Sequence, residues 1–231
     1  LTHEHTDHLL GMIWMIRMIA TKIRKEQYEG NLRIYCHSAL VETVRTIANL
    51  TLPKKFTRLL DHRIQFVPLH NGDTKHILDY DVTFFDILST KAKQYGFTMR
   101  LRNGQKLTCA GDEPLNEQCV GYAESSDWLM HEAFCLYSQR NQYDPYEKHH
   151  STVREACDLA SCLNVPNLIL YHTEDDNIER RKALYTAEGR LIFIGGLYVS
   201  GGLGCIPVDE VEFLVTVFEI FVWSGKLPIL I

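Results

Sequence analysis

The chain has 231 residues, a formal net charge of −5 and an apolar fraction of 45%. This composition is typical of a globular protein with one large or two small domains, and it excludes a protein that coats nucleic acid through bulk positive charge. Seven cysteines, none in a C-x-x-C pair, predict reduced, buried thiols and a cytoplasmic location. The apolar run at 9–19 is short and contains Arg17, so no membrane-spanning segment is expected.

The first residues carry the strongest motif of the chain. Three histidines and an aspartate lie within positions 3–8 in the pattern H-x-H-x-D-H. Imidazole and carboxylate groups are the usual ligands of zinc and of neighbouring transition metals. In a tight turn, His3 and His5 can point at one ion, and Asp7 and His8 at a second. The alternative of a solvated, histidine-rich tag is disfavoured, because an apolar run follows at 9–14, as in a loop that leads into a buried helix.

Helices and strands then alternate along the chain. Ser38 is the expected N-cap of one helix, and Thr152 with Glu155 forms a capping box that opens another. Arg102-Asn103-Gly104 is a hairpin signal. The predicted helices are at 9–26, 38–50, 152–163 and 177–187, and the predicted strands at 32–36, 64–69, 81–87, 96–101, 106–110, 128–130 and 168–171. This alternation predicts a layered α/β protein with its site at strand ends.

The last part of the chain has a different character. It is rich in glycine after residue 192 and strongly apolar at 211–223, where the alternation at 213–223 suits a strand. We therefore expect a domain at 1–191 and a divergent apolar and glycine-rich segment at 192–231, to which the sequence assigns no function.

Further polar residues lie where predicted strands end. Asp112 follows one strand, Glu132 lies next to His131 after another, and His172 ends a third, while His150 precedes the capped helix. Each of these residues alone is more often structural than functional. Together with the opening motif, they indicate one site assembled at the mouth of a sheet.

These residues resemble the metallo-β-lactamase fold in its ribonuclease Z-like branch. The resemblance covers about residues 2–190 and rests on the H-x-H-x-D-H motif, Gly111-Asp112, the segment 131–134, His150-Ser151-Thr152 and His172. It implies an α/β metallo-β-lactamase αββα sandwich that lacks the first N-terminal strands, since the motif would follow a buried strand in the family.

The resemblance also implies roles for the site residues. Two zinc ions are expected, with Mn²⁺ or Fe²⁺ as alternatives, and a hydroxide bound between them would attack a phosphodiester such as RNA or a small nucleotide. His150 would act with Asp7 in proton transfer to the leaving oxygen, and Glu132 would support it. The metal ligands implied are Asp7, His8 and His172 for one ion, His3 and His5 for the other, and Asp112 as the bridge.

Two departures from the family pattern leave alternatives open. The ligand expected between the opening motif and Asp112 is a histidine, but Leu88 occupies the place. His76, Asp86 or Ser89 could substitute for it, and otherwise only one metal is held.

The segment around 104–106 is a simple hairpin without the long insertion of some tRNA-processing members, which favours a general phosphodiesterase or an uncharacterised hydrolase over specific tRNA 3′ processing. The other readings are a thioester or lactone hydrolase on the same fold and a catalytically impaired fragment with one metal. A homodimer is expected by analogy only.

Five basic residues could form a surface for nucleic acid phosphates, although a solvated basic face is the more common explanation of such a group. They are Lys91, Lys93, Arg100, Arg102 and Lys106.

Overall fold

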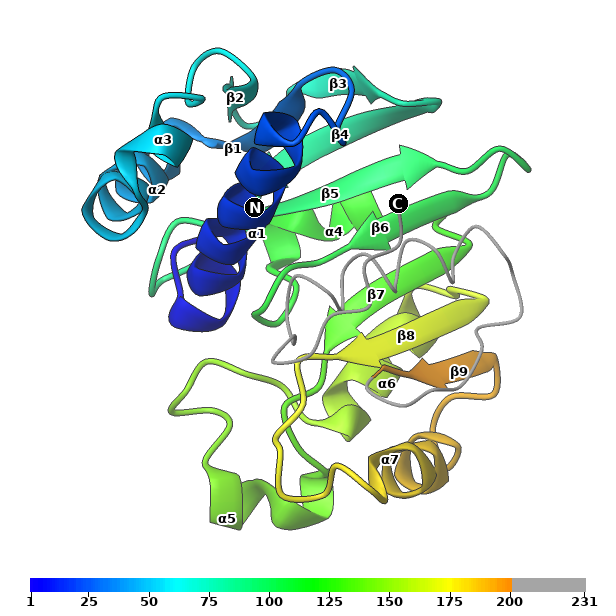
Figure 1. Cartoon of the computed structure of the whole chain (residues 1–231). Coiled ribbons are helices and arrows are strands. Elements are labelled where there is room, and N and C mark those ends of the chain that lie inside the picture. The colour runs from blue at the N-terminus through cyan, green and yellow to red at the C-terminus, as the bar shows by residue number, and fades with distance from the viewer. Residues whose placement is uncertain (201–231) are drawn as a thin grey trace.

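Two β-sheets organise the part of the chain that the computed structural model describes, residues 1–200. The smaller sheet pairs β1 (Leu32–His37) with β2 (Ile64–Leu69) in parallel. Figure 1 shows helices gathered at both ends of the molecule, α1, α2 and α3 beside the smaller sheet and α5, α6 and α7 near β8 and β9 of the larger sheet. The α/β class predicted from the sequence is confirmed.

The larger sheet has seven strands in the order β3-β4-β5-β6-β7-β8-β9. Its first half, from β3 to β6, is antiparallel, and its second half, from β6 to β9, is parallel. The parallel strands bring their carboxyl ends to one edge, where polar side chains from separate strands can meet. The strands are β3 (Thr74–Ile77), β4 (Tyr80–Asp86), β5 (Tyr95–Arg100), β6 (Lys106–Cys109), β7 (Trp128–Glu132), β8 (Asn167–Tyr171) and β9 (Gly196–Val199).

The first core cluster lies between the smaller sheet and three helices, which are α1 (Thr6–Arg24), α2 (Ser38–Thr51) and α3 (Lys54–Thr57). Met12, Ile16 and Ala20 recur at four-residue spacing and form one buried face of α1. This face shares its cluster with Leu40 and Val44 of α2. Because α1 is held by its apolar face, its first turn, which carries Asp7 and His8, has a fixed position.

A second core cluster lies between one face of the larger sheet and the helices α6 (Val153–Cys162) and α7 (Arg181–Gly189). The capping box predicted for α6 is present, with Thr152 and Glu155 bonded reciprocally. Leu129 and Leu168 belong to this cluster, while Trp128 and Ile169 belong to the cluster on the opposite face, as the two-residue period of strands requires. Short helices complete the described chain: α4 (Val120–Ala123), α5 (Arg140–Tyr143) and the 3₁₀ turns Glu117–Cys119 and Tyr137–Gln139.

Most predicted elements are confirmed to within a few residues, including the hairpin at Gly104, whose φ of 85° needs glycine. The N-cap of α2 was assigned wrongly: it is His37, whose Nδ1 accepts from the Leu40 N–H at 3.2 Å, and Ser38 is the first helical residue. Two strands were missed, β3 and β9. The helix predicted at 177–187 begins later, at Arg181.

Residues 201–231 lie outside the described part of the chain, and with them the strand predicted at 213–223. The division at residue 192 stays a prediction, although β9, which follows it, pairs with β8. Within residues 1–200, no helix has the length and apolarity needed to cross a membrane. Five of the six cysteines in this part are buried, as predicted, and Cys162 is exposed.

Candidate metal centre

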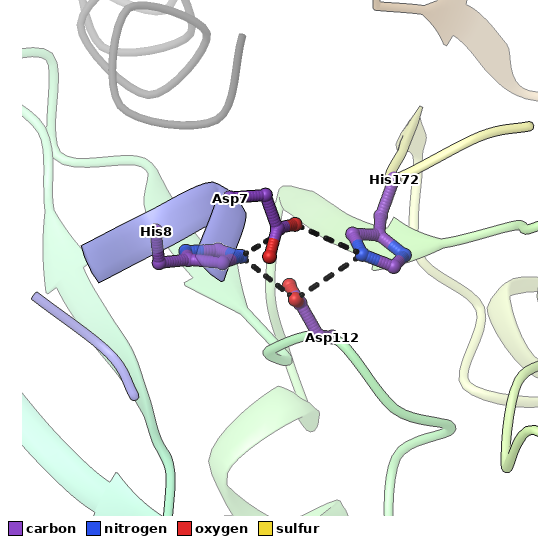
Figure 2. A group of neighbouring side chains, drawn as sticks. All are labelled: Asp7, His8, Asp112 and His172. Atoms are coloured by element: carbon purple, nitrogen blue, oxygen red, sulfur yellow. Dashed lines mark hydrogen bonds and ion pairs between the residues drawn. The ribbon is translucent and has the colours of Figure 1, made fainter. Parts of the chain in front are cut away.

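Four donor side chains from three separate parts of the chain converge at the carboxyl ends of strands β6 and β8 of the larger sheet (Figure 2). Asp7 and His8 lie in the first turn of α1. Asp112 lies in the loop after β6, and His172 directly follows β8. The sequence placed all four in one metal group, and the structure brings them together, with all four donor atoms within 4.8 Å of one another.

The distances between these donor atoms suit the coordination sphere of a single metal ion. The His8 Nε2 lies 2.8 Å and the His172 Nε2 lies 3.3 Å from Asp112 Oδ2. The Asp7 Oδ2 lies 3.5 Å from the His8 Nε2 and 3.7 Å from the His172 Nε2. Zinc ligands at bond lengths of about 2.0–2.1 Å in a tetrahedron are roughly 3.3 Å apart. The four donors therefore suit zinc or a similar ion with only small adjustment.

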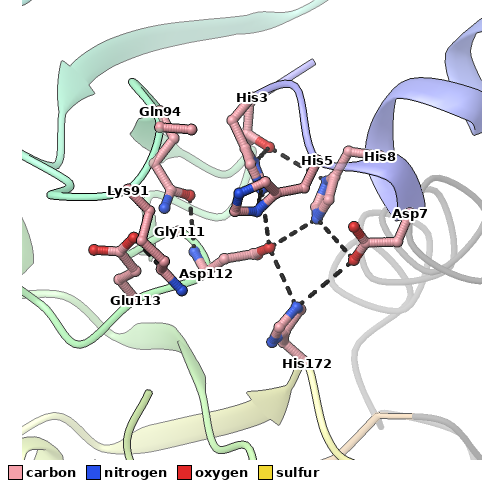
Figure 3. Close-up of polar contacts among 12 residues, drawn as sticks. His3, His5, Asp7, His8, Lys91, Gln94, Gly111, Asp112, Glu113 and His172 are labelled. Atoms are coloured by element: carbon pink, nitrogen blue, oxygen red, sulfur yellow. Dashed lines mark hydrogen bonds and ion pairs between the residues drawn. The ribbon is translucent and has the colours of Figure 1, made fainter. Parts of the chain in front are cut away.

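Of the remaining histidines of the opening motif, His3 reaches the same aspartate, and His5 contacts His3 (Figure 3). His3 is fully buried, and its Nε2 lies 3.4 Å from Asp112 Oδ2 and 2.9 Å from the His5 Nδ1. The Thr2 hydroxyl contacts the Nδ1 atoms of His3 and His8 at 3.0 and 3.4 Å. Because their Nδ1 atoms meet this hydroxyl, both rings turn the opposite nitrogen toward Asp112. The same carboxylate oxygen thus lies near the rings of His3, His8 and His172.

Two buried side chains hold the loop that carries Asp112. Gln94 accepts a hydrogen bond from the Asp112 N–H at 3.1 Å, and the Tyr171 hydroxyl donates to the Gly111 carbonyl. Gly111 has a φ of 90°, and a Cβ on it would lie 3.1 Å from Ile87 Cδ1, so both conformation and space favour glycine. Neither Gln94 nor Tyr171 was predicted from the sequence as part of the site.

The electrostatics of the group are strongly coupled. Burial by itself would raise the pKa of Asp112, but the charge on His172 and the hydrogen bond with His8 hold that pKa well below its usual range. The contact with His172 lowers the pKa of Asp7 to about 2. Burial opposes a charge on His172, yet Asp112 and Asp7 raise its pKa to about 9. Burial lowers the pKa of His3 to about 3. His3 is therefore neutral, as a metal ligand must be, while His172 has to lose a proton when a metal binds.

A second acid–base pair adjoins this group. The His150 Nδ1 lies 3.6 Å from Glu132 Oε2, and the other carboxylate oxygen of Glu132 accepts from the Ser151 N–H at 2.5 Å. The His150 ring stacks on Phe134 at 5.0 Å between centroids and lies 4.9 Å from the His172 ring. The pair predicted from the sequence is thus next to the metal group. His131 is not part of it, since its nitrogens meet the Leu115 N–H and the Glu132 carbonyl.

Leu88 brings no donor atom to the centre. Its backbone has a φ of 61°, and its side chain is 42% exposed and lines a pocket beside His150. The three residues suggested as substitutes are engaged elsewhere: His76 pairs with Asp81, Asp86 with Lys93, and Ser89 donates to Glu113. That Leu88 stands at a lost ligand position stays a prediction from the resemblance.

The five basic residues have individual partners, which weakens the idea of a shared phosphate surface. Lys93 pairs with Asp86 at 3.2 Å, and Arg102 pairs with Asp79 at 2.5 Å. Three others donate to backbone carbonyls: Lys91 to Lys148, Arg100 to Gly104 and Lys106 to Glu124.

Residues 1–173 match the family described as the beta-lactamase superfamily domain. The chain therefore belongs to this family. Curated relatives include ribonuclease Z of Thermococcus kodakarensis, 39% identical over 71 residues, and ribonuclease Z of Thermococcus onnurineus, 37% identical over 71 residues. These alignments cover 31% of this chain and only 21% and 22% of the relatives, so the chain spans about a fifth of their length.

Solved structures show the same fold. The metallo-β-lactamase fold protein YhfI from Bacillus subtilis aligns with a TM-score of 0.66 and 17% identity, over 87% of this chain and 73% of that protein. The short form of human tRNase Z aligns with a TM-score of 0.62 and 17% identity, over 90% of this chain and 78% of that protein. At these identities the likeness concerns the fold, and it confirms the metallo-β-lactamase fold expected from the sequence.

Proposed function

We propose that this chain is a metal-dependent phosphodiesterase of the ribonuclease Z type, with zinc as its metal. The observation that carries the proposal is the position of Asp112 Oδ2, which lies within 3.4 Å of a ring nitrogen of His3, His8 and His172. Asp112 is therefore the residue that could be shared between an ion held by His8 and His172 and a second ion beside His3, as a two-metal hydrolase would need.

The donor chemistry assigns the ligands. Asp7, His8 and His172 would hold one ion, His3 and His5 the other, and Asp112 both. Bound zinc would supply positive charge that stabilises the phosphoryl oxygens and lowers the pKa of the attacking water. Mn²⁺ and Fe²⁺ suit the same imidazole and carboxylate donors.

His150 and Glu132 supply the proton chemistry of the proposal. The buried Glu132 carboxylate faces the His150 Nδ1 at 3.6 Å, and its negative charge would stabilise the charged form of the ring. The opposite nitrogen, Nε2, is then the atom that would give a proton to the leaving oxygen. The Lys91 ammonium lies 3.5 Å from this nitrogen, and the leaving oxygen would have to take its place. Asp7, which lies 45% exposed at the open side of the metal group, would assist this transfer. An alkoxide leaving group needs such an acid more than a thiolate does, which favours phosphodiesters over thioesters.

The names of the relatives support a nucleic acid or nucleotide substrate. The two archaeal relatives are ribonucleases Z, and one solved neighbour is a tRNase Z. We extend this substrate class, RNA or a nucleotide phosphodiester, to the present chain as part of the proposal. A cytoplasmic location and a homodimer stay predictions.

The test uses protein loaded with zinc, bis(p-nitrophenyl) phosphate and a short RNA as phosphodiesters, and a thioester and a lactone for comparison. His150→Ala should lower turnover of the RNA by about 10²-fold or more, and that of bis(p-nitrophenyl) phosphate by less, because nitrophenolate leaves readily without an acid. His62→Ala, at an exposed histidine between α3 and β2, should leave both unchanged. Turnover of the thioester alone, insensitive to His150→Ala, would establish the other hydrolase reading.

Metal counting on the same samples separates an active two-metal site from an impaired one. Two zinc ions per chain are expected from the donor set. One ion per chain with no hydrolysis of any of the four substrates would establish the impaired reading, in which the place of Leu88 leaves one site incomplete.

A further inference from the structure

An open pocket of about 320 Å³ lies beside His150, between the loop that follows β4 and the loop that precedes α6. Its volume is at the lower end of the range for small-molecule sites, about 300–1,000 Å³. Neither the metal centre nor the proposed proton transfer uses this pocket. Its lining includes Leu88, Glu113, Asn116, Tyr146, His149 and His150.

Contacts across the pocket fix its two walls relative to each other. The Thr90 hydroxyl meets the His149 Nδ1 at 3.3 Å, and the Lys91 ammonium donates to the Lys148 carbonyl at 2.7 Å. The same ammonium lies 3.5 Å from the His150 Nε2. Residues 59 positions apart in the sequence are thereby joined. A ligand would find this pocket already formed, which reduces the ordering cost of binding.

The charges around the pocket compensate each other. Glu113 is buried, accepts from the Ser89 hydroxyl at 2.6 Å and lies 3.8 Å from the Lys91 ammonium. Figure 3 shows Lys91 and Glu113 side by side, next to the loop of Asp112. With this carboxylate paired, the pocket does not select strongly for a cation or for an anion. Asn116 and Thr90 add neutral polar groups to its lining.

The walls offer apolar and aromatic surface to solvent. Leu88 is 42% exposed and Tyr146 is 54% exposed, although both are large. The Tyr146 hydroxyl donates to Glu155, which holds the ring in place. Flat, partly polar groups that combine stacking with a few hydrogen bonds fit such a lining. A nucleobase has this chemistry, and aromatic side chains commonly bind bases by stacking.

We propose that this pocket is a subsite for the base of the nucleoside that leaves during phosphodiester hydrolysis. This inference rests on the proposed function, since His150 lines the pocket and is the residue assigned to protonate the leaving oxygen. In this arrangement the base lies against Leu88 and Tyr146, and the leaving oxygen of its sugar is directed toward His150, since all three residues line the same pocket. The subsite then explains why the loop carries a leucine, where the resemblance expects a histidine.

Binding of AMP and of ribose 5-phosphate tests the subsite, because the two ligands share sugar and phosphate and differ in the base. Calorimetry on zinc-loaded protein should show AMP binding about tenfold more tightly than ribose 5-phosphate. Leu88→Ala and Tyr146→Ala should each weaken AMP by about fivefold or more and leave ribose 5-phosphate unchanged. Tyr146→Phe keeps the ring and should keep most of the AMP affinity.

Leu78→Ala is the matched control, since Leu78 is also an exposed leucine with a positive φ, of 54°, and does not line the pocket. It should not alter AMP binding. Equal affinities of wild type for AMP and ribose 5-phosphate would overturn the subsite, as would equal effects of Leu88→Ala and Leu78→Ala. Hydrolysis of bis(p-nitrophenyl) phosphate by wild type reports on the proposed function alone, so the two failures are distinguishable.

Discussion

The hydroxyl of Tyr171 donates a hydrogen bond to the carbonyl of Gly111, which joins the end of β8 to the loop after β6. Tyr171 immediately precedes His172, and Gly111 immediately precedes Asp112. One buried hydrogen bond thus links the backbones next to two candidate metal ligands that lie 60 residues apart. Loss of a group that orients the ligands of a metal typically lowers the metal affinity by about 10–100-fold.

Tyr171→Phe should therefore lower zinc affinity by about 10–100-fold, because the Gly111 carbonyl loses its partner and the Asp112 loop loosens. Competition with a zinc chelator measures the effect. Tyr185→Phe is the control: the Tyr185 hydroxyl is equally buried in a core and donates to the Phe134 carbonyl at 3.0 Å, but it does not hold a metal-binding loop. Similar zinc affinities in the two variants would show that the Tyr171 bond serves stability only.

The pKa of His172 leads to a prediction about proton release. Asp112 and Asp7 raise this pKa from 6.5 to about 9, so the metal-free protein keeps the proton bound near pH 7. This proton stabilises the metal-free fold fully below pH 6.5, and its contribution is lost as the pH rises through about 9. Because zinc requires neutral imidazole, binding near pH 7 should release about one proton from His172.

Calorimetry in buffers of different ionisation enthalpy measures the protons released. The number should decline as the pH rises above about 9, where His172 is already neutral, and zinc affinity should increase up to the same pH. The outcome that contradicts this account is zinc binding near pH 7 with an enthalpy that does not depend on the buffer.

The candidate metal ligands could be recognised in the sequence because their chemistry is visible locally. His3, His5, Asp7 and His8 lie within one short segment, and a helix begins inside it. Asp112 and His172 follow apolar strands, and parallel strands bring their ends together. The supporting residues were not predictable in this way. No spacing in the sequence indicates that the Gln94 side chain accepts from a backbone N–H 18 residues later.

The missed elements have similar physical explanations. β3 is polar and alternates between exposed and intermediate burial, so it has no apolar pattern, and it forms by pairing with β4. β9 begins at Gly196, which is followed by three residues that also pair with β8, and glycine argues against a strand in isolation. His37 was passed over as a cap because serine is the more common N-cap residue. In each case, tertiary contacts outweigh the local preference.

The conformation of Gly111 gives a prediction about stability. Gly111→Ala places a side chain at a φ of 90° and 3.1 Å from Ile87 Cδ1. Gly104→Ala isolates the conformational part, because Gly104 has a φ of 85° with no atom within 4 Å of the added Cβ. Each variant should lose about 1–2 kcal/mol of unfolding free energy from backbone strain.

Gly111→Ala should lose more than Gly104→Ala, since Ile87 and Gln94 must also shift. It should also bind zinc more weakly, because Gln94 holds the Asp112 backbone. Denaturant unfolding and zinc titration of both variants provide the measurements. If Gly104→Ala proves the more destabilised of the two, crowding at Gly111 is not significant.

The contact between Glu132 and His150 predicts how activity depends on the pair. The His150 Nδ1 lies 3.6 Å from one carboxylate oxygen of Glu132, and the Ser151 N–H donates to the other. Glu132→Gln keeps an oxygen that can accept from the Ser151 N–H, but it turns an amide N–H₂ group toward the His150 Nδ1. This amide opposes the imidazolium that must donate a proton from Nε2, so kcat should fall by about 10²-fold while zinc binding is retained. Because both residues serve the same proton transfer, Glu132→Gln should cause little further loss in a His150→Ala background. Two full, additive losses in the double variant would mean that Glu132 acts on the reaction independently of His150.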